Sequence, residues 1–560
     1  MFRLQKVVAG SLKNARRVGS LGSFKLPKAE NEPFLDYAPG SGERAALAGA
    51  LEEVMGEVAE IPCVVGGEEV YTGNVVEQVM PTRHGHVLAK VHMADEGTTG
   101  AAIDAALEAR EEWMGMPAEA RLAIFRKAAD LLAGKHRAKV CAAVMLGTGK
   151  NVWQAEIDAA VETIDFLRFN PEYAQEIYAM QPPMNSPGNW NRSEYRPLEG
   201  FVLAVSPFNF CAIGTNLATA PAMMGNTVVW KPSTTAVLGN YLNFQILKEA
   251  GLPDGVINFL PGPGATIGDT CLASPHLAGL HFTGSTATFN ALQASIANNL
   301  DNYIGYPRVV GETGGKNFHF LHASADVQHA VNNTLRGAYE FQGQKCSAAS
   351  RLYVPASLWP EVRDTLVAET EKIKVGQPQE FDTFMTAVID KPSFDNIVGY
   401  LDAAKAAPDA EILTGGDADD SEGFFVQPTL IHTTNPHFLT MEEEIFGPVL
   451  TAYVYDDDKY EETLELCAST SPYALTGAIF AQDQGALNLA DLKLKEASGN
   501  YYINDKSTGA VVGAQPFGGA RASGTNDKAG SALNLLRWVS ARTIKENYVP
   551  LGDWRYPHMA

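Results

Sequence analysis

Cysteine is scarce in this chain, with six residues in 560. They are Cys63, Cys141, Cys211, Cys271, Cys346 and Cys467. No pair has the C-x-x-C spacing of zinc ribbons, thioredoxin-like motifs or c-type haem attachment, and so few cysteines in so long a chain do not build a disulfide framework. A reducing compartment is the simpler inference.

Positive charge and long apolar runs are also lacking. The chain has 43 lysines and arginines against 65 aspartates and glutamates, which gives a formal net charge of -22. Nucleic acids and anionic membranes bind basic surfaces, so neither is an expected partner. No apolar run approaches the ~18 residues that a membrane-spanning helix needs. We find no internal repeat, low-complexity tract or heptad run.

Acidic residues are absent from the first 29 positions, whereas basic residues are frequent there. The basic residues before Glu30 are Arg3, Lys6, Lys13, Arg16, Arg17, Lys25 and Lys28, with Ser11, Ser20 and Ser23 among them. A basic, serine-containing start without acids is typical of a mitochondrial transit peptide. We predict such a peptide over residues 1–25. The alternative is a disordered basic tail on a cytosolic protein.

The length of the chain predicts two or three domains. Two amphipathic helices are expected over 101–146 and a third over 151–169, because its apolar residues recur at helical spacing. From residue 201, short apolar strands alternate with helical segments. The strands are GFVLAVSP, NTVVWKP, GVINFLPG and GLHFTGS, and the helices are 214–224, 234–249, 264–273 and 285–298. This alternation predicts a parallel α/β sheet with helices on both faces.

A second α/β pattern runs from 311 to 500, and the β-prone end VSARTIKENYV indicates a terminal strand. In parallel sheets, ligands bind beyond the carboxyl ends of the strands. The residues that follow the first strands are therefore candidates for a ligand site. They are Ser206-Pro207-Phe208-Asn209, Lys231-Pro232-Ser233 and Thr283-Gly284-Ser285.

Two other motifs carry little weight. GPGATIG (262–268) is one residue off the dinucleotide fingerprint and follows the third strand of the series, so a turn and a helix start are favoured. His84, His86 and His92 could hold a metal, but no carboxylate or cysteine completes the cluster locally. No metal is therefore expected.

Cys346, in GQKCSA (343–348), is the candidate nucleophile. Taken alone, a lone cysteine is more often a core residue, because a free thiol is mostly protonated at neutral pH. Two other residues supply what a thiol catalyst needs. Glu312, in the glycine-rich GETGGKN (311–317), has the backbone room to act as a general base. Asn209, at the end of a strand, can donate its amide to an oxyanion.

Six segments in this order resemble the signatures of the aldehyde dehydrogenase superfamily over most of residues 60–550. They are SPFNF (206–210), WKPS (230–233), FTGS (282–285), GETGGKN, GQKCSA and EEIFGPV (443–449). AEIDAAVETIDFLRFN (155–170) and NDKSTGAVVGAQPFGGARASGTNDKAG (504–530) are similar to the branch that oxidises glutamate-γ-semialdehyde to glutamate with NAD, the second step of proline degradation. The resemblance implies an enzyme with a small-molecule substrate in the mitochondrial matrix.

The resemblance implies the following catalytic roles. Cys346 attacks the aldehyde, and Asn209 stabilises the thiohemiacetal oxyanion together with the Cys346 backbone N–H. Glu312 activates the water that hydrolyses the thioester. For NAD, the implied residues are Ser206, Pro207, Phe208, Lys231, Ser233, Gly284, Ser285, Glu444 and Phe446. A carboxylate that often disfavours NADP in this superfamily is replaced here by Thr234.

The branch also implies how the substrate is held. Ser347 and a Gly–Ser pair before the PFGG segment anchor its α-carboxylate, but here that pair is Gly509-Ala510, so only backbone N–H groups remain. Phe210 and Phe517 match aromatic residues beside the aliphatic chain, although both fit ordinary core packing. Glu162 matches the carboxylate that meets the α-ammonium, or is one more acid on a helix face.

The expected fold is α/β and aldehyde dehydrogenase-like. It has a Rossmann-type NAD-binding domain (30–182 and 201–310), an α/β catalytic domain (311–505) and a small β-flap for oligomerisation (183–200 and 530–560). Because the family is oligomeric and an exposed strand pair invites a partner, a homodimer is expected. Two alternatives remain: another acid-semialdehyde dehydrogenase, since Ala510 departs from the pattern, or a non-catalytic binding protein. The presence of Cys346, Glu312 and Asn209 disfavours the last.

Overall fold

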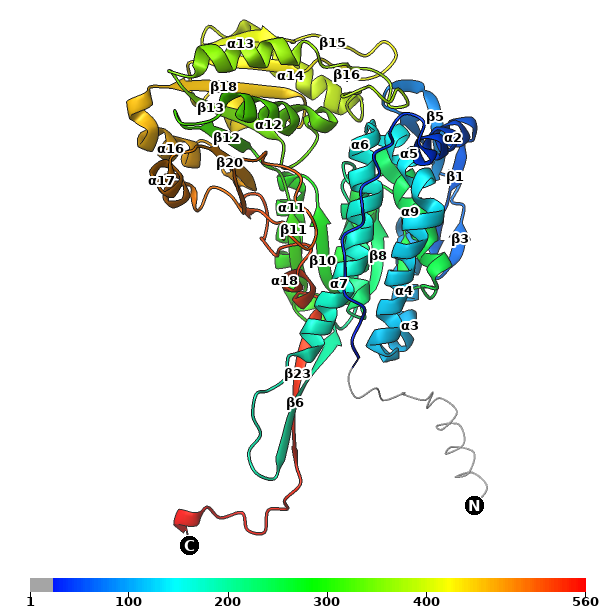
Figure 1. Ribbon diagram of the computed structural model, residues 1–560. Helices are drawn as coiled ribbons and strands as arrows, with labels where there is room; N and C mark the ends of the chain where they lie inside the picture. Colours follow the sequence, from blue (N-terminus) through cyan, green and yellow to red (C-terminus); the bar gives the residue numbers. More distant parts are fainter. Residues whose placement is uncertain (1–23, 560) are drawn as a thin grey trace.

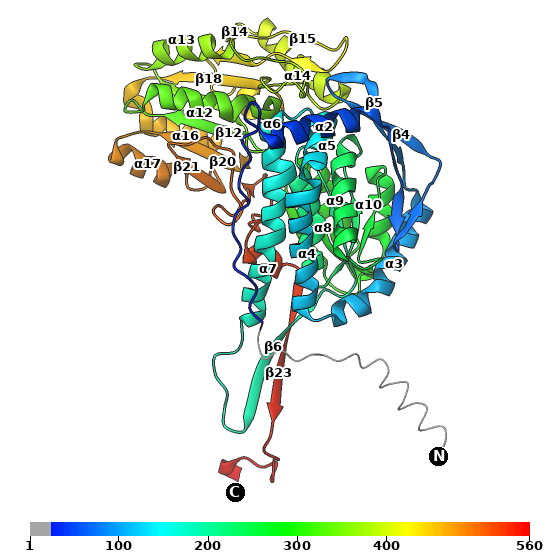
Figure 2. The same cartoon turned by 45° about the vertical axis from the view of Figure 1, so that its right-hand side comes forward.

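The structure is a computed structural model that describes residues 24–559 (Figure 1). Most of the predicted leader, residues 1–23, lies outside the described residues. Phe24, at the end of that predicted leader, already packs against the largest hydrophobic core. Two large sheets with their helices form the body, and a two-stranded arm projects from it (Figures 1 and 2).

The first sheet has seven strands in the order β11-β10-β7-β8-β9-β2-β3. Their bounds are β2 Cys63–Val65, β3 Glu68–Val70, β7 Phe201–Val205, β8 Thr227–Lys231, β9 Ile257–Phe259, β10 Leu277–Thr283 and β11 Arg308–Glu312. The four predicted strands are confirmed as the parallel centre, β10-β7-β8-β9. The chain order reverses between β7 and β10, and such a switch point opens a crevice for a ligand.

Helices cover both faces of this sheet. They are α3 Glu96–Gly115, α4 Ala118–Leu131, η1 Leu132–His136, α5 Arg137–Thr148, α8 Cys211–Met223, η3 Thr234–Ala236, α9 Val237–Ala250, α10 Gly264–Ala273, α11 Thr286–Asn298 and η4 Leu300–Asn302. The expected α10 start at Gly264 is confirmed. The two helices predicted over 101–146 are three, because Pro117 ends the first and a π-helical turn divides the rest.

The third predicted helix is longer than expected and is not uniform. It comprises α6 Val152–Ala155, the π-helical segment η2 Glu156–Glu162 and α7 Thr163–Ala179. We call the whole, residues 152–179, the long helix. Widened π turns are frequent at functional sites, and Glu162 is the last residue of this one.

The second sheet also has seven strands, in the order β14-β17-β18-β13-β12-β20-β21. Their bounds are β12 Asn317–Leu321, β13 Ala349–Pro355, β14 Ala410–Thr414, β17 Thr429–Thr433, β18 Val449–Tyr455, β20 Thr476–Phe480 and β21 Asn500–Ile503. Only the edge strand β14 is antiparallel. The accompanying helices are α12 Val327–Tyr339, η5 Glu340–Gly343, α13 Trp359–Thr370, α14 Lys391–Ala406, α15 Leu439–Glu442, η6 Asp457–Lys459, α16 Tyr460–Ser469 and α17 Gln484–Leu494.

The remaining elements lie outside the two large sheets. They are α2 Gly42–Gly56, the sheet of β1 Ala59–Ile61, β4 Val75–Met80 and β5 Arg83–His92, the pairs β15 Ala418–Asp419 with β16 Phe425–Val426 and β19 Tyr473–Ala474 with β22 Ala520–Arg521, and α18 Ala532–Leu536 and η7 Pro557–Met559. The arm joins β6 Asn189–Pro197 to β23 Val539–Asn547 along their whole length. The expected pairing of the flap with the C-terminal strand is therefore confirmed.

Candidate active site

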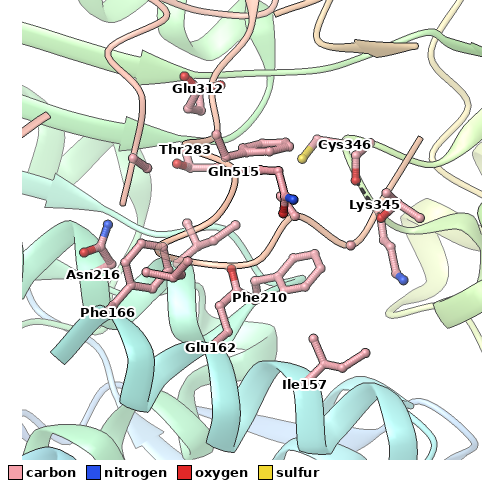
Figure 3. Close-up of a pocket in the computed structure, with 18 of the residues that line it drawn as sticks. Ile157, Glu162, Phe166, Phe210, Asn216, Thr283, Glu312, Lys345, Cys346 and Gln515 are labelled. Carbon is pink, nitrogen blue, oxygen red and sulfur yellow. Dashed lines mark hydrogen bonds between the residues drawn. The ribbon is translucent and has the colours of Figure 1, made fainter. Parts of the chain in front are cut away.

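A pocket lies between the two sheets and is closed on one side by the long helix (Figure 3). Figure 3 shows Glu162 and Phe210 facing Cys346 and Glu312 across this pocket. The lining includes eight of the nine residues predicted to be catalytic or substrate-binding: Glu162, Phe210, Glu312, Cys346, Ser347, Gly509, Ala510 and Phe517. These residues come from five separate stretches of the chain, so the fold brings together what the sequence keeps far apart.

Cys346 is the one cysteine of the six that is partly exposed, although its sulfur is largely shielded from solvent; the other five are buried. It follows η5 and precedes β13, and its carbonyl oxygen accepts a hydrogen bond from Asn317 Nδ2 at 2.7 Å. The loop can approach this closely because Gly315 lies against it: a Cβ there would come within 2.2 Å of the Cys346 oxygen. Burial of the sulfur raises its pKa, and the nearby carboxylates Glu444, Glu312 and Glu162 raise it further.

Glu312 ends β11 and points into the same pocket. Its Oε2 accepts the backbone N–H of Gly519 at 3.0 Å. Burial raises the pKa of this carboxyl well above its ordinary value, against the opposing effects of that hydrogen bond and of Lys528. A carboxylate with a raised pKa is a stronger base than an ordinary one, which suits it to accept a proton from water.

Asn209 lies beside the loop that carries the thiol. Its side-chain amide is 3% exposed and donates to the Gln344 carbonyl at 3.1 Å, two residues before Cys346. The amide has two hydrogens, so the second remains for another acceptor.

A buried ion pair fixes this strand end. Lys150 Nζ donates to Asp158 Oδ2 at 2.6 Å and to the Asn209 carbonyl, and both charged side chains are fully buried. Asp158 also accepts the first N–H groups of α8, from Cys211 and Ala212. The ammonium lies over the Phe210 ring, 4.2 Å from its centroid, a favourable cation–π contact. Lys150 was not predicted from the sequence, because no motif around it indicates that it contacts Asp158 and Asn209.

Lys150→Met is expected to lower the free energy of unfolding by about 3–5 kcal/mol, because it leaves the buried Asp158 carboxylate without its cation. Urea titration of the holoenzyme measures this. Lys139→Met is the matched control: Lys139 pairs with Glu53 at the surface, where both side chains are about half exposed, and we expect a change of less than about 1 kcal/mol. Equal effects of the two changes would contradict the role of the buried pair.

The two ends of the pocket carry different ionisable groups, a carboxyl at one and ammonium groups at the other. Glu162 projects from η2, and burial together with Asp158 raises its pKa to about 8, against Lys150. The neighbouring acids on the long helix have other partners: Asp158 pairs with Lys150, and Asp165 accepts a hydrogen bond from the Glu32 backbone N–H. A cation bound next to Glu162 would favour its ionised form.

Lys345 and Lys506 line the pocket and share one carboxylate, that of Glu340, at 3.0 and 3.1 Å. Burial alone would raise the pKa of Glu340, but the two ammonium groups outweigh it and lower the pKa. Two cations on one anion leave a surplus positive charge. Sequence reasoning missed these three residues, although Lys345 stands next to Cys346, because only the fold shows that they meet.

Hydroxyl and backbone donors lie at the same end. Ser347 Oγ donates to Thr508 Oγ1 at 2.9 Å, and both side chains are buried. Gly509 and Ala510 follow directly and line the pocket, so the fold brings the predicted anchor together with Ser347. Thr508, which the sequence did not single out, also lines the pocket two residues before Ala510 and carries a hydroxyl.

The predicted cofactor residues gather at the carboxyl ends of β7, β8 and β10 and on the loop of Glu444. The Phe208 and Phe446 rings meet edge to face with centroids 5.7 Å apart, which joins these two groups.

Ser285 caps α11, accepting the Thr288 N–H at 3.2 Å. Ser206 Oγ accepts a hydrogen bond from Trp230 Nε1 at 2.7 Å and donates one to the Gly214 carbonyl at 3.3 Å, so both bonds of this hydroxyl stay within the protein. Ser233 shares a hydrogen bond with Thr235, and the Gly284 N–H meets the Glu312 carbonyl.

These residues fit a dinucleotide. Lys231 Nζ bonds the Pro232 carbonyl at 3.2 Å and has further hydrogens to donate, while burial lowers its pKa to about 8. Glu444 accepts the Gly315 N–H at 2.8 Å, and burial raises its pKa to about 7. A Cβ on Gly314 would come within 2.2 Å of the Glu444 carboxylate, so glycine is required there. A cation, a carboxylate and the N-terminus of α11 suit ribose hydroxyls and a pyrophosphate.

The histidines singled out in the sequence point elsewhere. His84 Nε2 bonds the Asp420 carbonyl at 2.9 Å, and His92 Nε2 bonds Glu60 at 2.9 Å. Between residues 24 and 559 we find no group of three histidines, cysteines or acids placed to hold a metal ion. Over the same residues, no helix is both long and apolar enough to cross a membrane.

Comparison with known proteins defines the class first. The model of the aldehyde dehydrogenase family matches residues 70–544, and the chain belongs to this family. The chain is 57% identical to Delta-1-pyrroline-5-carboxylate dehydrogenase, mitochondrial, of Dictyostelium discoideum over 98% of this chain and 99% of that one. It is 55% identical to the Homo sapiens protein of the same name over 95% and 94%. The Delta-pyrroline-5-carboxylate dehydrogenase of Mycobacterium tuberculosis, solved with NAD, superposes with a TM-score of 0.93 at 47% identity over 97% and 100%.

Proposed function

We propose that the protein oxidises L-glutamate-γ-semialdehyde, the open form of Δ1-pyrroline-5-carboxylate, to L-glutamate with NAD, the second step of proline degradation. The observation that carries this is the pocket itself. The pocket brings together a thiol, a carboxyl that can act as a base, the Glu162 carboxyl and the surplus positive charge of Lys345 and Lys506. A substrate with an aldehyde, an α-ammonium and an α-carboxylate matches all of these groups.

The chemistry follows from the positions of the side chains. The Cys346 thiol loses its proton to water, its Sγ forms a bond to the aldehyde carbon, and the π pair of the C=O bond moves onto the oxygen. The resulting oxyanion is stabilised by the Asn209 amide and the Cys346 N–H. NAD, when bound, supplies the acceptor for the hydride that leaves this carbon. Lys231, Glu444 and the start of α11 would hold it. The thioester that remains on Cys346 is attacked by water as Glu312 takes the water's proton, which releases the carboxylate and the thiol.

Substrate recognition follows from the charges. We assign Glu162 to the α-ammonium, and Ser347 with the backbone N–H groups of Gly509 and Ala510 to the α-carboxylate. Lys345 adds a cation to that end. Phe210 and Phe517 border the aliphatic chain. The change at Ala510 favours, as a second candidate, an acid-semialdehyde dehydrogenase with another substrate.

The assay compares NADH formation by the full chain with Δ1-pyrroline-5-carboxylate and with succinate semialdehyde, which lacks the α-ammonium. We expect kcat/KM to favour the former at least tenfold, since a buried charge pair contributes more than 1.4 kcal/mol. Glu162→Gln should remove most of this preference. Preference for succinate semialdehyde would leave the family chemistry standing and overturn the substrate assignment. The same assay with NADP tests the effect of Thr234.

The protein is placed in the mitochondrion on the likeness to relatives that carry that word in their names, and we propose the matrix as its compartment. We also propose the predicted division into an NAD-binding domain, a catalytic domain and a flap. The arm of β6 and β23 supports a homodimer, because it projects from the body (Figure 1) and the C-terminal tail that follows β23 carries exposed apolar residues. These are Leu551, Trp554 and Tyr556.

A further inference from the structure

Residues 24–37 form an extended segment, here called the N-terminal strap, that lies along the long helix. It is visible as the dark blue chain beside α7 (Figures 1 and 2). The strap precedes the part of the chain matched by the family model, which begins at residue 70.

The strap is bonded to the helix at regular intervals. Four of its backbone N–H groups donate to side chains of the helix: Leu26 to Gln175, Ala29 to Glu172, Glu32 to Asp165 and Leu35 to Glu156. The order is antiparallel. From the first of these bonds to the last, the extended strap spans about 30 Å at ~3.3 Å per residue, and the helix spans about the same at ~1.5 Å per residue. The two lengths match, so the strap follows the helix without slack.

Charged contacts reinforce this placement. Glu32 pairs with Arg168 at 2.8 Å and also with Arg137. The Tyr37 hydroxyl donates to Glu156 at 2.7 Å, and the Phe34 ring stacks on Trp153 with centroids 5.3 Å apart. Arg137 and Glu156 are themselves buried and paired. The strap is therefore an integral part of the fold beside the substrate pocket.

Asn31 connects the strap to the pocket on two sides. Its Nδ2 donates to Asp165 Oδ2 at 2.7 Å and to the Val512 carbonyl at 2.8 Å. Asp165 lies about one helical turn after Glu162. Val512 lies two residues after Ala510, in the loop whose residues 509, 510 and 512 line the pocket. One amide group thus links the helix that carries Glu162 to the loop that carries the backbone donors.

The loop has little other support at this point. Within residues 24–559, the bond from Asn31 is the only hydrogen bond that ties residues 509–513 to another segment; the others run between Val511 and residues 514–515. Apolar contacts of Val512 and the approach of Gly513 to the Phe169 ring complete its packing. The position of the two N–H groups at Gly509 and Ala510 therefore depends on a single polar tie.

We propose that Asn31 is a positioning residue for substrate recognition. It holds the 509–513 loop at a fixed distance from Glu162. The loop N–H groups can then bind the α-carboxylate while Glu162 binds the α-ammonium of the same substrate molecule. This inference rests on the proposed function. Because Ala510 lacks a side-chain donor, the geometry of the loop backbone matters more here than it would with a serine.

Asn31→Ala tests this. Loss of the one hydrogen bond that ties this loop to another described segment is expected to raise KM for Δ1-pyrroline-5-carboxylate roughly fivefold, while kcat stays within about twofold. KM for propanal, which has neither charged group, and KM for NAD should not change. Lys28→Ala is the control, an exposed strap residue whose side chain makes no hydrogen bond among the described residues.

A second readout separates the outcomes. Hydrogen exchange at residues 509–513 should accelerate in Asn31→Ala and not in Lys28→Ala. Unchanged exchange and unchanged KM would overturn the inference, and so would an equal rise of KM for propanal, which marks a general loss of structure. If the unaltered chain prefers succinate semialdehyde, the proposed function fails, whereas the exchange measurement still decides whether Asn31 holds the loop.

Discussion

Cys346→Ala is expected to abolish aldehyde oxidation, with a loss of at least about 10⁴-fold in kcat, because no other thiol among the described residues lines the pocket to form the thioester. NAD binding should persist. The implied cofactor residues lie on β7, β8, β10 and the Glu444 loop, and none is bonded to the Cys346 side chain. NADH formation and isothermal titration with NAD measure the two properties on the same preparation.

The control for this change is Cys271→Ala. Cys271 is fully buried in α10, away from the pocket, and has the same chemistry as Cys346 without its setting. Activity should be retained in this variant. If Cys346→Ala kept even a tenth of the activity, the covalent route would be wrong and direct hydride removal from a hydrated aldehyde would have to replace it.

The protonation state of the Cys346 thiol predicts how its reactivity depends on pH. Burial and the three nearby carboxylates raise the pKa of Cys346, so the thiol is protonated at neutral pH before ligands bind. The folded pKa lies above the ordinary thiol value, hence the thiolate fraction grows only as pH rises through that higher pKa. Alkylation of the unaltered enzyme by iodoacetamide should therefore be slow at neutral pH and accelerate in alkaline solution.

Much of the fold could be predicted because local patterns determine it. Strands β7, β8, β9 and β10 are buried on both faces and therefore appear as continuous apolar runs. Each ends in proline, glycine or serine. The π-helical turns η1 and η2 could not be predicted, because no local pattern in the sequence marks a widened helical turn. The antiparallel edge β14 was missed, since its residues are half exposed and have no clear alternation.

The residues of the candidate site also fall into two groups, those that local motifs predict and those that only the fold brings together. Cys346, Glu312 and Asn209 could be found from short motifs, because reactive residues stand in distinctive loops. Glu340 could not, because its partners Lys345 and Lys506 are 5 and 166 residues away. Asn31 lies in a segment without helical or strand periodicity, and its role comes from contacts with Asp165 and Val512 that only the folded chain creates.

Glu312→Gln is the second large effect: steady-state turnover should fall by about 10²–10⁴-fold, the usual contribution of a general base. The amide cannot take the water's proton, although its oxygen can still accept the Gly519 N–H that holds the carboxylate in place. Covalent attack by Cys346 and oxidation precede the step that needs this base. A stoichiometric burst of NADH should therefore appear, followed by slow turnover, in stopped-flow absorbance.

The thioester itself can be detected. Mass spectrometry of the quenched Glu312→Gln enzyme should show the substrate acyl group on the peptide that contains Cys346. Glu422→Gln, which alters an exposed acid paired with Arg83, should show neither the burst nor the adduct at steady state. Full turnover by Glu312→Gln would remove Glu312 from the hydrolytic step. A uniformly slow reaction without a burst would place it earlier, where the thiol loses its proton, since the raised pKa of the carboxyl suits it to accept a proton from sulfur as well as from water.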